Sequence, residues 1–303
     1  MKITKTKLKQ IIKEEIEQLA RGRSNITLSS DQVQNIRQTQ DSAKKIIKFL
    51  TSTDPDDVEQ GLAILDVLED QQLTDTIASY FVFDSKSNSI TTRGFYLPQE
   101  LGMILNYFSE KSVHVKNMLA QIEKLVINYS NFITNVDFLR FCTNLTNLDL
   151  SYCRSLENVD GLKGCTNLWS LNLYYCDSLQ NVNVLKGCTN LTRLDLNQCR
   201  SLENVDGLQG LTNLRTLDLS YCSSLENVDG LKGCTNLMGL YLIECKLLQN
   251  VDGLKECTNL WSLDLSRCEL LPPELQKYFV TNSSGTAYEQ FMEALNASKR
   301  NSL

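Results

Sequence analysis

The sequence contains one histidine, His114, and no apolar run long enough to cross a bilayer. Nucleophilic triads and most structural zinc sites need histidine or closely spaced cysteine pairs, and a membrane span needs about 18 consecutive apolar residues. The chain has no Cys-x-x-Cys pair either. We therefore expect no zinc site, no membrane span and no triad enzyme, and we interpret His114 as a structural or surface residue.

An excess of positive charge is also missing, because 30 Lys and Arg face 36 Asp and Glu and the net charge is −6. Nucleic-acid-binding domains usually carry a basic patch, so no nucleic-acid partner is expected. The sequence has no glycine-rich phosphate loop. Its first residues, MKITKTKLKQ, are basic but lead into an amphipathic stretch, which is not typical of a secretory signal. Together these absences predict a cytoplasmic protein without a cofactor.

The feature that dominates the sequence is a repeat of 23 residues. The pattern L-x-x-L-x-L-x-x-C begins at Leu145, Leu168, Leu191, Leu214, Leu237 and Leu260, and a degenerate copy begins at Ile122. The copies continue as x-x-L-x-N-V-x-x-L-x-x-C-T-N until the pattern stops at Pro272, and Leu211 replaces one of the second cysteines. A fixed period of about 20–29 residues built on L-x-x-L-x-L is the signature of leucine-rich repeats.

The pattern predicts a fold. L-x-L alternation places both leucines on one face of a short strand, which must stack on the next copy to bury them. The strands are expected near Leu125–Ile127, Leu148–Leu150, Leu171–Leu173, Leu194–Leu196, Leu217–Leu219, Leu240–Leu242 and Leu263–Leu265. The return segments have room only for 3₁₀ or single-turn helices. We predict an α/β right-handed solenoid with a parallel concave β-sheet and helical caps at both ends.

The stretch LTNLRTLDLS, residues 211–220, resembles the repeats of bacterial internalin-type surface proteins. The resemblance covers about half of the chain. Each copy is one residue longer than in that family. Cysteine replaces the usual asparagine, as in cysteine-containing repeat subclasses, at Cys153, Cys176, Cys199, Cys222, Cys245 and Cys268. The resemblance implies a protein-binding scaffold and names no particular partner.

Outside the repeats the sequence predicts helices. Residues 1–23 form an amphipathic helix whose apolar stripe, within residues 4–20, is a candidate for self-association. A polar linker (24–40), a helical capping domain (41–121), the solenoid of seven repeats (122–271) and a C-terminal helical cap (272–303) follow. Within the capping domain, Asp54 caps a helix that starts at Pro55, and Ser85–Ser89 is a loop. The C-terminal helices are expected at Glu274–Val280 and Ala287–Ala297.

Two slots inside the repeat need interpretation. All eleven cysteines fall on core positions, so we expect reduced, buried thiols without disulfides. Glycine follows aspartate in four copies, at Gly161, Gly207, Gly230 and Gly253. Because Val184 and Phe138 occupy the same slot elsewhere, we interpret this glycine as dispensable.

The side chains between the strand leucines should point outwards. The central row reads Val126, Asp149, Asn172, Asp195, Asp218, Tyr241 and Asp264, which predicts an acidic ladder on strands about 4.8 Å apart. Arg193 is expected to offset repulsion between the two adjacent aspartates. Tyrosines line one rim, and Trp169 and Trp261 line the other.

Acidic and aromatic residues together suit a partner protein with a basic or aromatic-rich surface. The predicted binding residues are Asp149, Tyr152, Asn172, Tyr174, Tyr175, Arg193, Asp195, Asp218, Tyr221, Tyr241 and Asp264. Since they lie outside the leucine core, their replacement should leave the fold intact.

The same surface residues allow other interpretations. Duplication alone copies surface residues without any selection for binding. Two carboxylates about 5 Å apart also occur in retaining glycosidases, but an open sheet gives no means of separating their pKa values. On the return side, we interpret the asparagine row (Asn135 to Asn250) as structural and the lysine row (Lys163, Lys186, Lys232, Lys255) as solvated.

The favoured function is a non-enzymatic scaffold that binds a partner protein. The alternatives are a self-assembly module using the N-terminal helix and a host-directed effector exported by an unconventional route.

Overall fold

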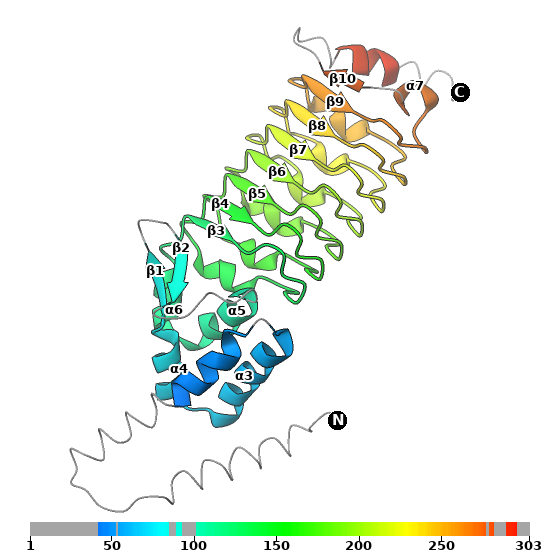
Figure 1. Ribbon diagram of the computed structural model, residues 1–303. Helices are drawn as coiled ribbons and strands as arrows, with labels where there is room; N and C mark the ends of the chain where they lie inside the picture. The colour runs from blue at the N-terminus through cyan, green and yellow to red at the C-terminus, as the bar shows by residue number, and fades with distance from the viewer. Residues whose placement is uncertain are drawn as a thin grey trace, which may run out of the picture.

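The computed structural model describes residues 42–52, 54–84, 89–92, 101–276, 279–281 and 289–295. The predicted N-terminal helix and linker lie outside the described residues. The repeats form an elongated stack with helical elements at its two ends, and β3 to β9 follow one another along it (Figure 1). Every helix among the described residues is too short or too polar to cross a bilayer.

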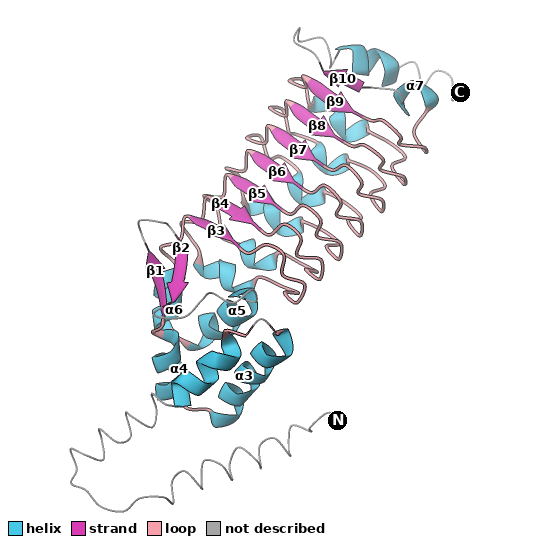
Figure 2. Cartoon of the chain, in the orientation of Figure 1, coloured by secondary structure: helices cyan, strands magenta, loops and turns pink. Residues whose placement is uncertain are grey.

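In the described residues, one side of the stack is a sheet of parallel strands. They are β3 (Lys124–Val126), β4 (Asn147–Asp149), β5 (Ser170–Asn172), β6 (Arg193–Asp195), β7 (Thr216–Asp218), β8 (Gly239–Tyr241) and β9 (Ser262–Asp264). Each strand pairs in register with the next, so that Leu148 lies opposite Leu171. Figure 2 shows these strands on one side and the helical turns on the other. The predicted strands and their order are confirmed, with each strand beginning one residue earlier than expected.

The core between sheet and return segments is filled by the leucines and cysteines of the repeat, all of them buried. The first cysteine slot also provides a hydrogen-bond donor. The thiol of Cys199 donates to the carbonyl of Leu173 at 3.2 Å, and Cys222 donates to Leu196 at 3.2 Å. The same bond recurs at Cys153, Cys176, Cys245 and Cys268. This row of thiols therefore ties each repeat to the one before it.

The return segments are short 3₁₀ turns, as the repeat length predicted. They are η1 (Asp137–Phe141), η2 (Asp160–Leu162), η3 (Asn183–Gly187), η4 (Asp206–Leu208), η5 (Asp229–Leu231) and η6 (Asp252–Glu256). The asparagine row opens these turns, because each Oδ1 accepts the N–H two residues on, as Asn227 does from Asp229 at 3.1 Å. The structural interpretation of that row is confirmed.

The interpretation of the Asp-Gly glycines as dispensable is wrong. A Cβ at Gly230 would lie 2.0 Å from the carbonyl oxygen of Val205, and Gly207 and Gly253 stand equally close to the preceding repeat. None of these glycines has a positive φ. Glycine is needed because two backbones approach each other. Val184 fits the same slot in η3 because η2 and η3 lie less closely together than the other neighbouring turns.

The N-terminal cap contains helical residues 42–50, α3 (Pro55–Leu68), α4 (Gln71–Ala78), α5 (Leu101–Lys111) and α6 (Val113–Leu119). Asp54 caps α3 by accepting from the N–H of Asp56, as predicted. The sequence did not predict the hairpin of β1 (Phe81–Asp84) and β2 (Ser89–Thr92). His114 bonds through Nε2 to the carbonyl of Phe81 at 2.8 Å, which gives it a structural role.

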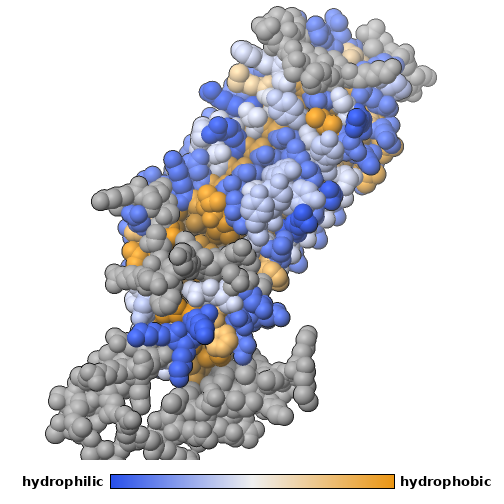
Figure 3. All heavy atoms as spheres, viewed as in Figure 1, coloured by the Kyte–Doolittle hydropathy of each residue, from blue (hydrophilic) through white to orange (hydrophobic). Residues whose placement is uncertain are grey.

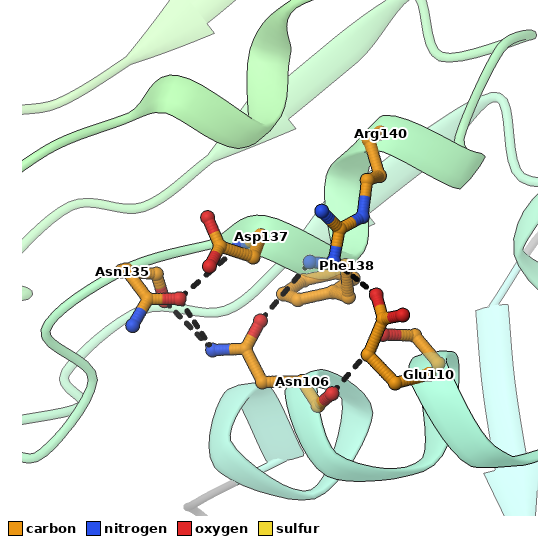
Figure 4. Close-up of polar contacts among 7 residues, drawn as sticks. Asn106, Glu110, Asn135, Asp137, Phe138 and Arg140 are labelled. Atoms are coloured by element: carbon orange, nitrogen blue, oxygen red, sulfur yellow. Dashed lines mark hydrogen bonds and ion pairs between the residues drawn. The ribbon is translucent and has the colours of Figure 1, made fainter.

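A side-chain amide joins this cap to the first repeat. Asn106 of α5 points toward the start of η1 (Figure 4), where its Nδ2 donates to the carbonyl and to Oδ1 of Asn135, both at 3.0 Å. Its Oδ1 accepts the N–H of Phe138 at 3.0 Å. An ion pair between Glu110 and Arg140 lies beside it. The amide thus satisfies backbone groups of the first repeat that no earlier repeat can reach.

The C-terminal end differs from the prediction. The helix α7 covers only Pro273–Gln276, and β10 (Phe279–Thr281) then pairs antiparallel with β9. The predicted helix Glu274–Val280 is therefore wrong at Phe279 and Val280. An exposed edge of β9 would present unpaired backbone groups, and β10 satisfies them. Residues 289–295 are helical, within the last predicted helix.

Substitution of Gly230 by alanine should lower the free energy of unfolding by about 1–3 kcal/mol, because the new Cβ forces two backbones apart. Gly187→Ala is the matched control, since a Cβ there meets no atom within 4 Å. It should be neutral or slightly stabilising. Chemical denaturation of both variants measures the difference. Equal stability of the two would contradict the close-approach explanation.

Candidate protein-interaction surface

The outward side of the sheet, here called the strand face, presents two rows of side chains. The first row is Asp149, Asn172, Asp195, Asp218, Tyr241 and Asp264 in β4 to β9. The second lies two residues later in each repeat and holds Ser151, Tyr174, Asn197, Ser220, Ile243 and Ser266. The parallel ladder extends past the strands, because Gln198 N–H donates to the Ser220 carbonyl at 2.8 Å. Equivalent residues therefore stay side by side in both rows.

The acidic row has a structural role that the sequence reading missed. Oδ1 of Asp195 accepts the N–H of Asn197 at 2.9 Å, and Oδ1 of Asp218 accepts that of Ser220 at 2.8 Å. Asp149, Asn172 and Asp264 do the same. Replacement of these residues is thus not neutral for the fold in general. Substitution of one of these aspartates by asparagine keeps the Oδ1 acceptor, whereas substitution by lysine removes it.

Asp195 and Asp218 lie directly opposite each other in β6 and β7. Arg193 does not offset their charge as expected, because its guanidinium lies 4.1 Å from the ring centroid of Trp169. The amide of Asn197 does so instead, since its Nδ2 donates to Oδ2 of Asp218 at 3.2 Å. Burial raises the pKa of the Asp195 carboxyl, and the charges of Asp218 and Asp149 raise it further.

Four tyrosines form a cluster at the N-terminal end of the strand face, the tyrosine ledge (Tyr129, Tyr152, Tyr174 and Tyr175). Tyr129 is exposed, and the other three are half-buried. Tyr129 and Tyr152 stack with centroids 4.5 Å apart, and Tyr152 and Tyr175 with centroids 5.5 Å apart. Arg154 and Arg200 lie over the Tyr175 ring. Tyr129, which is 65% exposed, was expected at the rim but not among the binding residues. In Figure 3, apolar side chains gather where the first repeats meet the cap.

The rim tyrosines occupy an unusual backbone conformation. The residue before the first cysteine slot of each repeat, which holds Ser130 in the first copy, is here called the turn position. Its φ is between 59° and 63° at Tyr129, Tyr152, Tyr175, Gln198, Tyr221, Glu244 and Arg267. A left-handed conformation costs an ordinary L-residue roughly 1–2 kcal/mol, and glycine or asparagine adopts it more readily. The turn requires the conformation but gives no reason for tyrosine.

The predicted binding residues do not all come together. The tyrosine ledge is continuous with Asn172 and Asp149 through neighbouring strands. Tyr221 is 39% exposed and is separated from the ledge by the Gln198 repeat. Asp264 is only 5% exposed and lies on the strand that β10 covers, so it leaves the accessible surface. Asn197, Ser220, Arg154 and Arg200 were not predicted. The first two share a face with Asp195 and Asp218 by strand alternation, which was a usable signal.

The cysteines are free and buried. Burial raises the pKa of Cys188 and Cys234 to about 11 and that of Cys165 and Cys257 to about 12. Thiolate formation is therefore disfavoured in the second slot. Within the described residues, no three His, Cys, Asp or Glu side chains are placed to hold a metal ion.

Stacked strand-and-turn units of this length define a leucine-rich-repeat solenoid, a fold that generally serves as a protein–protein interaction module. A family model described as "BspA type Leucine rich repeat region (6 copies)" matches residues 75–194, and one described as "Leucine Rich repeats (2 copies)" matches residues 189–233. The chain is a leucine-rich repeat protein. The first match begins within α4, although the repeating strands begin only at β3.

Solved structures with the same kind of repeat are similar over about half of the chain. Internalin C2 from Listeria monocytogenes is 21% identical, with a TM-score of 0.32, and the match covers 54% of this chain and 91% of that one. Internalin F from the same organism is 18% identical, with a TM-score of 0.24 and coverages of 55% and 75%. The leucine-rich repeat domain of the type III effector XopL is 20% identical, with a TM-score of 0.39 and coverages of 53% and 65%. No curated protein sequence matches the chain.

Asp195→Asn should stabilise the protein at neutral pH, because it keeps the turn acceptor and removes a charge that burial disfavours. The folded state holds the Asp195 proton more tightly than the unfolded state. The wild-type side chain therefore contributes its stability below the ordinary aspartate pKa and loses it as pH rises through the raised value. The advantage of the variant should vanish at acidic pH. Thermal unfolding between neutral and acidic pH measures it.

Asp149→Asn is the comparison for this experiment, since it makes the same change between uncharged neighbours in β3 and β5. Its stabilisation at neutral pH should be smaller. An Asp195→Asn protein that is less stable than wild type at neutral pH would show that the carboxylate is favoured rather than strained.

The eleven thiols should be inert in the native protein, because all are buried and free. Titration with a chromogenic disulfide reagent at neutral pH should release no product until denaturant is added, and then a signal for all of them. Rapid reaction of any thiol before unfolding would contradict the assignment of the cysteines to the core.

Proposed function

We propose that the chain is a non-enzymatic scaffold that binds another protein through the strand face. The observation that carries the proposal is tyrosine at the turn position of the first three repeats and again at Tyr221. The backbone there would accept residues that cost less. Tyrosine is among the side chains that contribute most to binding energy at protein interfaces. A tyrosine that is costly for the fold and stays exposed, as Tyr129 and Tyr221 do, or half-buried supports a role in binding.

The acidic row indicates the character of the partner. Asp149, Asp195 and Asp218 lie on one face of a chain whose net charge is −6. A partner with basic and aromatic side chains suits this face, and its association rate should fall as salt rises. The same charge opposes nucleic acid, whose backbone is a polyanion.

Three further expectations stay proposals. Eleven free, buried thiols favour a reducing compartment, which supports a cytoplasmic location. The division into capping domain, solenoid and C-terminal cap at residues 121/122 and 271/272 is retained. Residues 4–20, the candidates for self-association, lie outside the described ranges, and export as an effector stays an alternative.

The proposal predicts that Tyr175→Gln combined with Tyr221→Gln weakens partner binding at least tenfold while the fold persists. Gln198 occupies the same turn position at φ 61°, so the backbone accepts glutamine there. Proteins that co-purify with the wild-type chain from its native cell are identified first. The affinity of each purified candidate is then measured against wild type and variant.

The matched control is Lys163→Gln combined with Lys232→Gln on the return side, where Gln209 occupies the same slot. This control should bind the partner like wild type. A partner lost from the lysine variant and kept by the tyrosine variant would move the site to the return side.

A further inference from the structure

Four polar residues meet at the middle of the strand face. Asp195 ends β6 and Asn197 follows it, and Asp218 ends β7 and Ser220 follows it. These four residues, in the same slots of adjacent repeats, define a central polar square. With ordinary sheet spacing it measures about 5 Å across the strands and about 7 Å along them. Tyr174 on the β5 side and Tyr241 on the β8 side place aromatic side chains beside it. Among the described repeats, adjacent aspartates occur in the first row only here.

The polar square contains more hydrogen-bond acceptors than the protein itself uses. Ser220 is 1% exposed, yet its hydroxyl has no hydrogen-bond partner. Oδ1 of Asn197 is also buried and unpaired, and its orientation is fixed because Nδ2 of the same amide donates to Asp218. A buried polar atom without a partner destabilises the folded state, because nothing replaces the hydrogen bonds that it makes to water in the unfolded chain. Both atoms lie in the slot next to the two carboxylates, on the same side of the sheet.

We propose that the central polar square is the subsite for an arginine side chain of the protein partner. The inference deepens the proposed function and rests on it. A guanidinium offers five N–H donors in one plane and carries a permanent positive charge. It can donate to the Asp195 and Asp218 carboxylates. The buried oxygens of Asn197 and Ser220 become accessible to it when the side chains that cover them move aside. Tyr174 and Tyr241 supply aromatic neighbours for the cation.

The spacing favours an extended cation over a compact one. An ammonium group donates from a single point, and a calcium ion needs six to eight oxygens at about 2.3–2.6 Å. The oxygens here are spread over two strands and two residues along each strand. An ammonium between the strands can donate to the two carboxylates, whereas a planar group several ångströms wide also extends along the strands toward Asn197 and Ser220. Binding of the cation would also relieve the repulsion from Asp218, which adds to burial in raising the pKa of Asp195.

The test uses a small probe and no partner protein. N-acetyl-arginine methylamide is titrated into the full-length chain, and the backbone amide shifts of the β6 and β7 repeats are followed by NMR. The neutral isostere N-acetyl-citrulline methylamide is the ligand control. The arginine probe should give saturable shifts centred on Asn197 and Ser220, and the citrulline probe should bind at least tenfold more weakly.

Asp195→Asn combined with Asp218→Asn keeps both turn acceptors, as Asn172 does in the preceding repeat. This variant should bind the arginine probe at least tenfold more weakly. Ser220→Ala should weaken it severalfold. Asp160→Asn combined with Asp206→Asn makes the same charge change on the return side, where Asn183 fills the slot, and should bind like wild type.

Equal binding of arginine and citrulline probes would overturn the assignment, as would wild-type affinity in the Asp195/Asp218 or the Ser220 variant. Stronger shifts of the same amides by calcium chloride than by the probe would make the site a metal site and overturn it too. Because the partner is absent from this test, a negative result leaves strand-face binding standing. Strand-face binding itself is tested by the variant that combines Tyr175→Gln with Tyr221→Gln.

Discussion

The backbone hydrogen bonds that join equal slots of successive repeats are the constraint on which the structure depends. Leu196 N–H donates to the Asp218 carbonyl and Leu219 N–H to the Tyr241 carbonyl, both at 2.8 Å. Every side chain therefore stands about 4.8 Å from the residue in the same slot of the next copy. A residue type suits a slot only if it tolerates itself as a neighbour. Leucine does so by packing, and cysteine by donating to the carbonyl of the repeat before. Charged residues do so poorly, and at Asp195 the charge of Asp218 adds to burial in raising the carboxyl pKa.

The same constraint makes the ends of the stack the weak points, because a first or last repeat lacks one neighbour. The cap supplies substitutes for the missing groups. Asn144 donates to the carbonyl of Ala120 at 2.9 Å, as Asn213 does to Thr189 at 2.9 Å inside the stack. The end of α6 thus stands in for a preceding repeat, and Asn106 performs a similar task at η1. At the other end, β10 occupies the edge of β9.

Strand register, core residues and 3₁₀ turns could be predicted because a period of 23 fixes which residues meet. Contacts between copies were harder to predict. The need for Gly230 comes from the distance between two backbones, and no property of the Asp-Gly pair encodes it. The hairpin β1–β2 and the strand β10 depend on pairing with distant segments, which tertiary context decides. Within the site, strand alternation placed Asp195 and Asp218 correctly. Strand alternation did not reveal that Arg193 packs on Trp169. From its position the Arg193 side chain could have reached either Trp169 or the two aspartates.

Comparing the same slot in successive copies also identifies surface residues that the fold does not require. From the second repeat onward, the slot of Leu196 holds only leucine and the slot of Cys199 only cysteine, because the core and the thiol bonds require them. The turn position varies among tyrosine, glutamine, glutamate and arginine at the same φ, so the backbone accepts all of them. Duplication would explain identical residues in that slot, but it does not explain why the tyrosines are consecutive, in ring contact and joined to Tyr174. Their grouping beside the central polar square places the chemically distinctive residues on one continuous part of the strand face. That is the arrangement expected where one partner must contact several repeats together.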